Sequence, residues 1–334
     1  MENINSSSTF NSVFASYLSD FLSLQRALGF KYQTEEKLLL RFDRYCIEHH
    51  LEEPVVTKKF LEDWCTKTDH EKIGNVNKRI IIVRKFLMYT VSLGLSQYLP
   101  KVSGKSDIVV PHLFTEEEMT DFFEIVDSYI PKVGKYQQYA IRMANEYKIL
   151  FRMYACCGLR NSEASKLLTK CFDLENGIIT VLDAKGDKDR VVYVPDDLNR
   201  MCNQYHDALI QNLGFDSPYF FPGMDPLNGI PNTTVDAVFY RYWKMTQNSD
   251  HCNNKPTVHD FRFTFITKRL NLWAKQRMPV MQLLPYLSVY CGHKSMEETY
   301  YYYHVYKDLY DVIDQMDKTS PAVIPEVHSY EQTV

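Results

Sequence analysis

The segment Gly158-Leu-Arg-Asn-Ser-Glu163 follows an apolar stretch with helical spacing in the second half of this 334-residue chain. Its glycine is typical of a helix end, and Asn161 or Ser162 can cap a following helix. Arg160 is therefore predicted at a helix N-terminus, where a guanidinium and backbone N–H groups could bind one phosphate together. The alternative is a surface ion pair between Arg160 and Glu163.

A β-hairpin is predicted downstream of this segment, in a chain that otherwise reads as helical. Residues 178–182 and 190–194 are rich in β-branched side chains and flank a charged turn. A lysine on such a turn can reach a DNA groove and donate a proton to a leaving oxygen. Lys185 is the first candidate, with Lys188 and Arg190 beside it, although charged turns are often simply solvated.

Two further motifs lie toward the C-terminus. His259 and Arg262 are three residues apart and would share one face of a helix, either as a phosphate-binding pair or as part of a capped helix start. Cys291-Gly-His293 precedes four consecutive tyrosines, residues 300–303. Because successive helical residues point about 100° apart, at most one or two of these tyrosines can enter one pocket. The others are expected to pack as an aromatic stripe.

The order of these motifs resembles that of the tyrosine recombinase family, which includes phage integrases, chromosome-dimer resolvases and transposon integrases. The resemblance covers residues 112–310 by motif. It implies a mainly α fold with a small β-hairpin or sheet, in which a helical core-binding domain precedes an α+β catalytic domain. The implied catalytic residues are Arg160, Lys185, His259, Arg262, His293 and Tyr302, with Glu163 as the structural partner of the first arginine.

The resemblance also implies a chemistry, the cleavage and rejoining of DNA strands through a 3′-phosphotyrosine intermediate. Arg160 and Arg262 would neutralise the nonbridging phosphate oxygens. His293 would add a hydrogen bond, Lys185 would act as general acid, and His259 as an acid or base near the attacking tyrosine. No metal and no other cofactor is needed.

Three alternatives compete with this function. A DNA-binding accessory protein could keep the fold and lose catalysis, and a type IB topoisomerase-like enzyme could use the same chemistry only to relax DNA. A metal-dependent hydrolase would need carboxylate or cysteine partners for His259 and His293 at suitable spacing, which the sequence lacks.

The sequence departs from the family pattern in two places. Phe263 follows the second arginine, where the family usually has histidine, so a supporting contact is expected to be missing. The segment between Arg262 and His293 is also longer than in most members, and it resembles recombinases of mobile elements. Integration or excision of such an element is therefore the expected role.

Four parts of the chain are expected. Residues 1–98 form a helical core-binding domain, 99–111 a linker rich in proline, glycine and serine, 112–304 the catalytic domain, and 305–334 a C-terminal helix with an acidic tail. Thr115 and Glu118 form a capping-box pattern at the start of the second domain. In the first domain, helices are expected over 10–22, from Thr34, over 57–66 and over 76–92. Its expected DNA contacts are Lys78, Arg79, Arg84 and Lys85, with Lys188 and Arg190 in the second domain.

The composition permits a DNA-binding protein without requiring one. The net charge is −4, but the last 40 residues hold eight acidic and two basic side chains, and the remaining chain holds 36 basic and 34 acidic ones. Eight cysteines show no zinc-type spacing, and the adjacent Cys156 and Cys157 are expected to be buried thiols in a reducing compartment. With no signal or membrane-spanning segment expected, the protein is predicted to be cytoplasmic and to associate with the nucleoid.

The expected partners are double-stranded DNA at specific sites and further copies of the chain, as a tetramer on paired sites. Sister recombinases or a directionality factor are also candidates. After the tyrosines, Val305, Leu309, Val312, Ile313 and Met316 form an apolar stripe at helical spacing. This helix would pack either on its own domain or on a neighbouring subunit.

Overall fold

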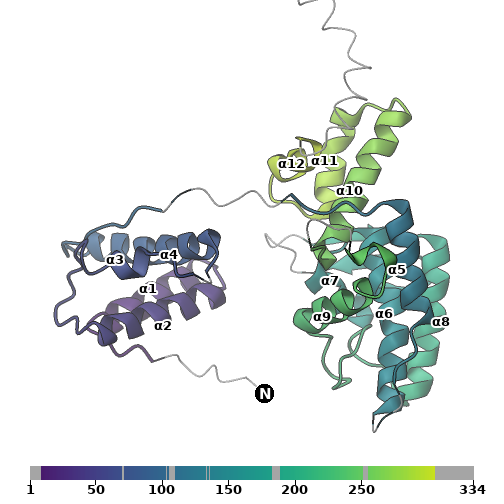
Figure 1. The fold of residues 1–334 in the computed structure, drawn as a ribbon, viewed down its shortest axis with the longest axis horizontal. Helices are drawn as coiled ribbons and strands as arrows, with labels where there is room; N and C mark the ends of the chain where they lie inside the picture. The colour runs from purple at the N-terminus through teal and green to yellow at the C-terminus, as the bar shows by residue number, and fades with distance from the viewer. Residues whose placement is uncertain are drawn as a thin grey trace, which may run out of the picture. The chain divides into compact units, whose positions relative to one another are not determined.

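The computed structural model describes residues 9–69, 71–102, 104, 110–132, 134, 136–182, 189–250 and 255–304. The chain divides into two compact units, residues 1–109 and 110–334, and this boundary lies inside the predicted linker. The described residues are mostly helical, with one three-stranded antiparallel sheet, which confirms the predicted fold class (Figure 1). Lys185, Lys188 and the predicted C-terminal helix lie outside the described residues.

The first unit is a small helical domain built around aromatic side chains. Phe14, Phe42 and Phe86 are fully buried, and the ring centroids of Phe14 and Phe86 are 5.4 Å apart. Asp43 is buried beside them and accepts hydrogen bonds from the N–H groups of residues 11 and 12 at 2.9 Å. Its helices are α1 (Ala15–Ala27), α2 (Gln33–Glu48), α3 (Glu62–Cys65) and α4 (Ile73–Ser92).

The helix predicted over residues 57–66 is wrong for most of its length, because only Glu62–Cys65 is α-helical. The preceding backbone is held by other partners. The N–H of Val56 donates to the Gln97 side chain at 2.7 Å, and its carbonyl accepts from the N–H of Tyr98 at 2.9 Å. Val56 is thus paired with residues 97 and 98, and residues 58–61 form turns that lead into α3.

The second unit is organised around one long helix, α6 (Gln137–Cys157), on which α5, α8 and α10 pack (Figure 1). The predicted capping box is present, with the Glu118 N–H donating to Thr115 Oγ1 at 3.1 Å and the Thr115 N–H donating to the Glu118 carboxylate at 2.8 Å. The other helices are α5 (Glu116–Ser128), α7 (Asn161–Ser165), α8 (Asp196–Leu213), α9 (Asn232–Trp243), α10 (Val258–Lys275), α11 (Val280–Cys291) and α12 (Met296–His304).

The sheet contains the predicted hairpin and one additional strand. β2 (Ile178–Val181) and β3 (Arg190–Tyr193) pair antiparallel, with Val181 opposite Arg190. The additional strand, β1 (Phe172–Asp173), pairs with β2. Two residues are too few to show an alternating pattern, so β1 could not be recognised in the sequence.

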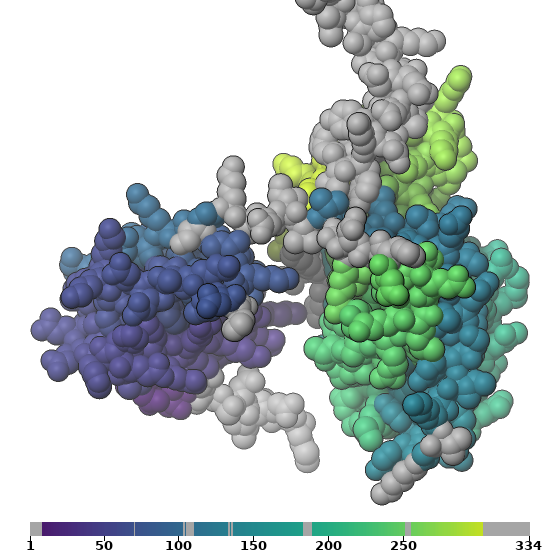
Figure 2. All heavy atoms as spheres, in the orientation of Figure 1, coloured from purple at the N-terminus to yellow at the C-terminus, as the bar shows by residue number. Residues whose placement is uncertain are grey.

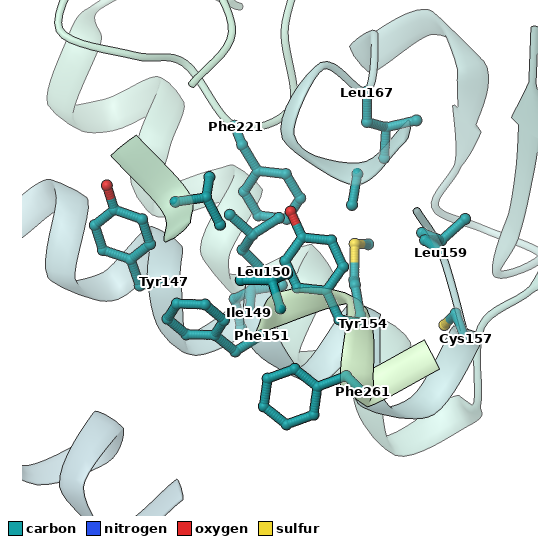
Figure 3. Packing of buried hydrophobic residues seen from close by; sticks show 14 of the residues in the cluster. Tyr147, Ile149, Leu150, Phe151, Tyr154, Cys157, Leu159, Leu167, Phe221 and Phe261 are labelled. Carbon is teal, nitrogen blue, oxygen red and sulfur yellow. The ribbon is translucent and has the colours of Figure 1, made fainter. Parts of the chain in front are cut away.

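The core of the second unit is aromatic where α6 meets α10. Figure 3 shows Leu150, Phe151 and Tyr154 of α6 close to Phe261 of α10, and all four are fully buried. In the space-filling view, the green atoms around α9 lie directly against the blue and teal atoms of the preceding helices (Figure 2). Phe261 also stacks on Phe114 with centroids 4.7 Å apart, which attaches the segment before α5 to α10.

Only one of the two adjacent cysteines is in this core. Cys157 is buried, whereas Cys156 is exposed, so the prediction of two buried thiols was wrong for Cys156. Neighbouring helical residues point about 100° apart, so α6 can present only one of them to the core. Among the described residues, no helix is long and apolar enough to span a membrane.

Candidate active site

The turn between α6 and α7 requires a glycine and sets the position of Arg160. Gly158 has a φ of +63°, and a Cβ there would lie 2.4 Å from a ring carbon of Phe265. Arg160 itself is the N-cap of α7, where Asn161 or Ser162 was expected. Asn161 has other partners, since its amide donates to Asp236 at 2.9 Å and its oxygen accepts from the Tyr154 hydroxyl at 3.0 Å.

Glu163 joins two arginines. Its carboxylate accepts from Arg160 Nη1 at 2.7 Å and from the Arg160 backbone N–H at 2.8 Å. Arg190 binds both carboxylate oxygens, at 2.9 and 2.7 Å, and its Nε donates to the Tyr290 carbonyl at 2.8 Å. Burial tends to raise the pKa of Glu163, but Arg190 and Arg160 outweigh it and hold that pKa at about 2.

We expect Glu163→Gln to lower the free energy of unfolding at pH 7 by about 3 kcal/mol, since it leaves a buried arginine without its counter-charge. The folded-state pKa of Glu163 is depressed to about 2. Its ionic contribution is therefore complete above the unfolded pKa of about 4.3 and is lost as the pH falls toward 2. Denaturant unfolding of both proteins should show the difference shrinking over this interval. A difference independent of pH would contradict the ionic role.

The two candidate phosphate-binding arginines converge on the C-terminus of α11. Arg262 is 1% exposed, and its Nη1 donates to the Gly158 carbonyl at 2.8 Å while its Nη2 donates to the Cys291 carbonyl at 2.5 Å. Arg160 Nη2 donates to the next carbonyl, that of Gly292, at 2.5 Å. These carbonyls orient both guanidinium groups, so motifs more than 100 residues apart in sequence meet at one place.

The two candidate histidines lie in the field of these arginines. The pKa of His259 is lowered mainly by partial desolvation and next by the charge of Arg262. Part of the His259 surface is still exposed to solvent. Burial and then the charges of Arg262 and Arg160 lower the pKa of His293 to about 3. Both imidazoles are therefore neutral at physiological pH. His259 can accept a proton, and His293 can donate one ring N–H.

Tyr302 of α12 lies in this site. It is 6% exposed, and its ring stacks on that of His293 with centroids 5.5 Å apart. Burial raises the pKa of Tyr302, and the charge of Arg262 opposes this effect. Tyr301 is 40% exposed, which agrees with the expectation that few of the tyrosines share one pocket.

Phe263 has a structural role in place of the family's usual histidine. Its ring lies 4.2 Å from that of Tyr302, centroid to centroid, and is buried. The sequence predicted that a supporting contact would be missing at this position. The structure instead has a different contact there, the packing of the Phe263 ring against Tyr302. Nothing in the sequence alone distinguished these two outcomes.

Three of the expected DNA-contacting side chains are bonded inside the protein. Arg190 is buried on Glu163, and Arg79 is 3% exposed and donates to Glu71 and to the Thr66 carbonyl, both at 2.6 Å. Arg84 donates to the carbonyls of residues 99 and 100. The DNA-contact prediction is wrong for Arg79 and Arg190, whose charge is used within the fold. Lys78 and Lys85 are exposed on α4 and stay candidates.

A cavity of about 620 Å³ lies beside Arg160, between α7 and the sheet. Lys166 and Thr180 also line this cavity, so it contains a second basic side chain, that of Lys166, besides Arg160. Among the residues that the structure describes, no group of three or more His, Cys, Asp or Glu side chains could hold a metal ion.

Comparison with known proteins identifies the class to which this fold and site belong. Residues 114–308 match the model of the phage integrase family, so the chain belongs to this family. It is a tyrosine recombinase, an enzyme that breaks and rejoins DNA strands.

Two relatives from bacteria illustrate the match. A protein provisionally named integrase/recombinase y4rB, from Sinorhizobium fredii, is 24% identical over 87% of this chain and 92% of its own length. Tyrosine recombinase XerC of Pediococcus pentosaceus is 26% identical over 83% of this chain and 92% of its own.

Solved structures share the fold. The integrase of transposon Tn1549, in complex with transposon right-end DNA, covers 90% of this chain and 98% of its own, with a TM-score of 0.62 and 17% identity. The XerH site-specific recombinase in its post-cleavage complex covers 85% of this chain and 78% of its own, with a TM-score of 0.60 and 18% identity.

Proposed function

We propose that this tyrosine recombinase cleaves DNA with Tyr302 in a site formed by Arg160, Arg262, His259 and His293. The observation that carries the proposal is the buried Tyr302 ring stacked on His293, with the charge of Arg262 acting on its hydroxyl. A structural aromatic stripe alone would not require two arginines and two neutral histidines around one of its rings.

The chemistry follows from the charge on the substrate. The anionic oxygens of a phosphodiester repel nucleophiles, so cleavage requires their neutralisation, a placed nucleophile and a proton for the leaving oxygen. Arg160 and Arg262 supply the positive charge, and the neutral His293 adds one N–H. The Tyr302 oxygen forms a bond to phosphorus as the bond to the 5′-oxygen breaks. His259 accepts the tyrosine proton, because its lowered pKa keeps it neutral.

Lys185 is proposed to give the 5′-oxygen its proton. We expect Lys185→Ala to cleave an ordinary phosphodiester about 10²-fold more slowly, within the range of general acid catalysis. A substrate with sulfur in place of the leaving 5′-oxygen should restore the rate, because a thiolate leaves without a proton. Single-turnover cleavage of the two substrates measures this. A defect that sulfur does not relieve would exclude Lys185, and Lys188 would be tested next.

Tyr302 lies in the site of its own chain, so the geometry supports cleavage by the subunit that supplies the arginines. Assembly as a tetramer on paired DNA sites, with the segment after residue 304 packing on a neighbour, is part of the proposal. So is a role for the exposed Lys78 and Lys85 in binding the DNA backbone. Double-stranded DNA is the proposed substrate, and the nucleoid the proposed location.

A mobile element is the proposed context. The long segment between Arg262 and His293 and the shared fold of the Tn1549 transposon integrase support integration or excision. Sister recombinases or a directionality factor would then set the direction.

The test uses duplexes from the DNA that flanks the gene, nicked so that the cleaved strand diffuses away. The purified chain should become covalently attached to such DNA and should join two paired sites. Relaxation of supercoils without joining would favour the topoisomerase-like alternative. Binding with no adduct on any flanking site would favour the accessory protein.

A further inference from the structure

Thr299 lies behind the histidine of the site, on the helix that carries the nucleophile. It is fully buried, and its Oγ1 is 2.6 Å from Nδ1 of His293. It precedes Tyr302 by three residues on α12, so both side chains reach His293 from one helix, Thr299 at the ring edge and Tyr302 at the ring face. No motif in the sequence pointed to this threonine.

The direction of this hydrogen bond can be worked out from the partners of the hydroxyl. A buried hydroxyl needs an acceptor. Within the described part of the chain, His293 Nδ1 is the acceptor in reach of Thr299, and the helix carbonyls are not bonded to its Oγ1. The threonine O–H therefore donates to Nδ1, which must be unprotonated.

Because the His293 ring is neutral, the bond from Thr299 determines which of its two nitrogens carries the single proton. Burial, and then the charges of Arg262, Arg160 and Arg190, disfavour the imidazolium, so the ring carries a single proton. Because Nδ1 accepts from Thr299, that proton is on Nε2. A neutral histidine with Nε2–H can donate to a phosphate oxygen, whereas the opposite tautomer would present a lone pair to an anion.

We propose that Thr299 is a positioning residue that fixes His293 as the Nε2–H tautomer and connects this donor to the helix of Tyr302. The inference rests on the proposed role of the site in DNA cleavage. Since Thr299 and Tyr302 move together with α12, the donor is oriented for phosphate only while the nucleophile is in place. Thr299 acts through His293 and contacts no reacting atom.

The first test reads the tautomer directly and needs no activity. In the full-length protein labelled with ¹⁵N-histidine, the His293 signals, identified by their loss in His293→Gln, should show a protonated Nε2 and an unprotonated Nδ1. Thr299→Val, which keeps the shape and removes the donor, should give mixed tautomers, and Thr299→Ser should restore the wild-type pattern. A protonated Nδ1 in the wild type would overturn the proposal.

The second test measures single-turnover adduct formation on the nicked flanking DNA. Thr299→Val should be about tenfold slower, the low end for losing a group that orients a functional histidine, and Thr299→Ser close to wild type. Thr246→Val is the matched control, because Thr246 is also buried and bonded within the second unit. Adding Thr299→Val to His293→Gln should cost nothing further.

The two proposals fail in different ways. If the wild type forms no adduct while its His293 is the Nε2–H tautomer, the proposed cleavage fails and the role of Thr299 in fixing the tautomer stands. If the wild type forms the adduct and Thr299→Val matches it in rate and tautomer, only the inference about Thr299 is overturned. An additive loss in the double variant would also overturn it, since Thr299 would then act by another route.

Discussion

Tyr302→Phe should abolish the covalent protein–DNA adduct while leaving the fold and DNA binding intact. The substitution removes one oxygen, and the phenyl ring can keep its stacking on His293 and its packing on Phe263. The nucleophile is absent, and phenylalanine offers no other atom for attack. The measurement is the fraction of DNA retained on denatured protein after reaction with the nicked flanking duplex.

Tyr301→Phe is the matched control, because Tyr301 is the exposed neighbour on the same helix. It should form adduct at the wild-type rate. Adduct formation by Tyr302→Phe together with its loss in Tyr301→Phe would mean that another tyrosine of the run attacks. Loss of DNA binding in Tyr302→Phe would instead mark the tyrosine as a structural residue.

The motifs of the site could be predicted because each requires particular residue types in a fixed order. The prediction for Arg190 went wrong because its position on a strand was not taken into account. Arg190 and Val192 are buried on β3, whereas Val191 and Tyr193 are 57% and 56% exposed. Alternation along a strand places residues two apart on the same face, so Arg190 shares the inner face with a valine. That signal was in the sequence.

Arg79 repeats this lesson on a helix. It lies three residues after Val76 and four before Val83, both fully buried, so it belongs to the apolar stripe of α4. A counter-charge from Glu71 makes this burial possible. The prediction of DNA contacts for all four basic residues of α4 ignored the helical period. Lys78 and Lys85 lie off the stripe and are exposed.

Some features could not be predicted because they depend on contacts between distant segments. The Thr299 hydroxyl could have bonded its own helix, as threonines often do. Only the fold brings it within 2.6 Å of His293. The packing of Phe263 on Tyr302 likewise depends on how α12 lies against α10, which no local pattern specifies.

Arg262→Lys should slow cleavage by at least about 10²-fold, comparable with the loss of one preorganised donor to a developing anion. Arg262 already donates to the carbonyls of Gly158 and Cys291, and its planar group can present further N–H groups to a phosphate in a fixed direction. A lysine keeps the charge, but its ammonium group cannot donate hydrogen bonds to both carbonyls and to two phosphate oxygens at the same time.

DNA binding should change much less than cleavage, because a recombinase contacts many phosphates and one charge is retained. Site affinity and the single-turnover rate are to be measured on the same duplex at one salt concentration. Arg269→Lys is the matched control, since Arg269 is exposed on the same helix and lies over the Phe265 ring, outside the arginine and histidine cluster. If Arg262→Lys loses affinity and rate by equal factors, Arg262 is an ordinary DNA contact. A selective loss of rate places it at the transition state.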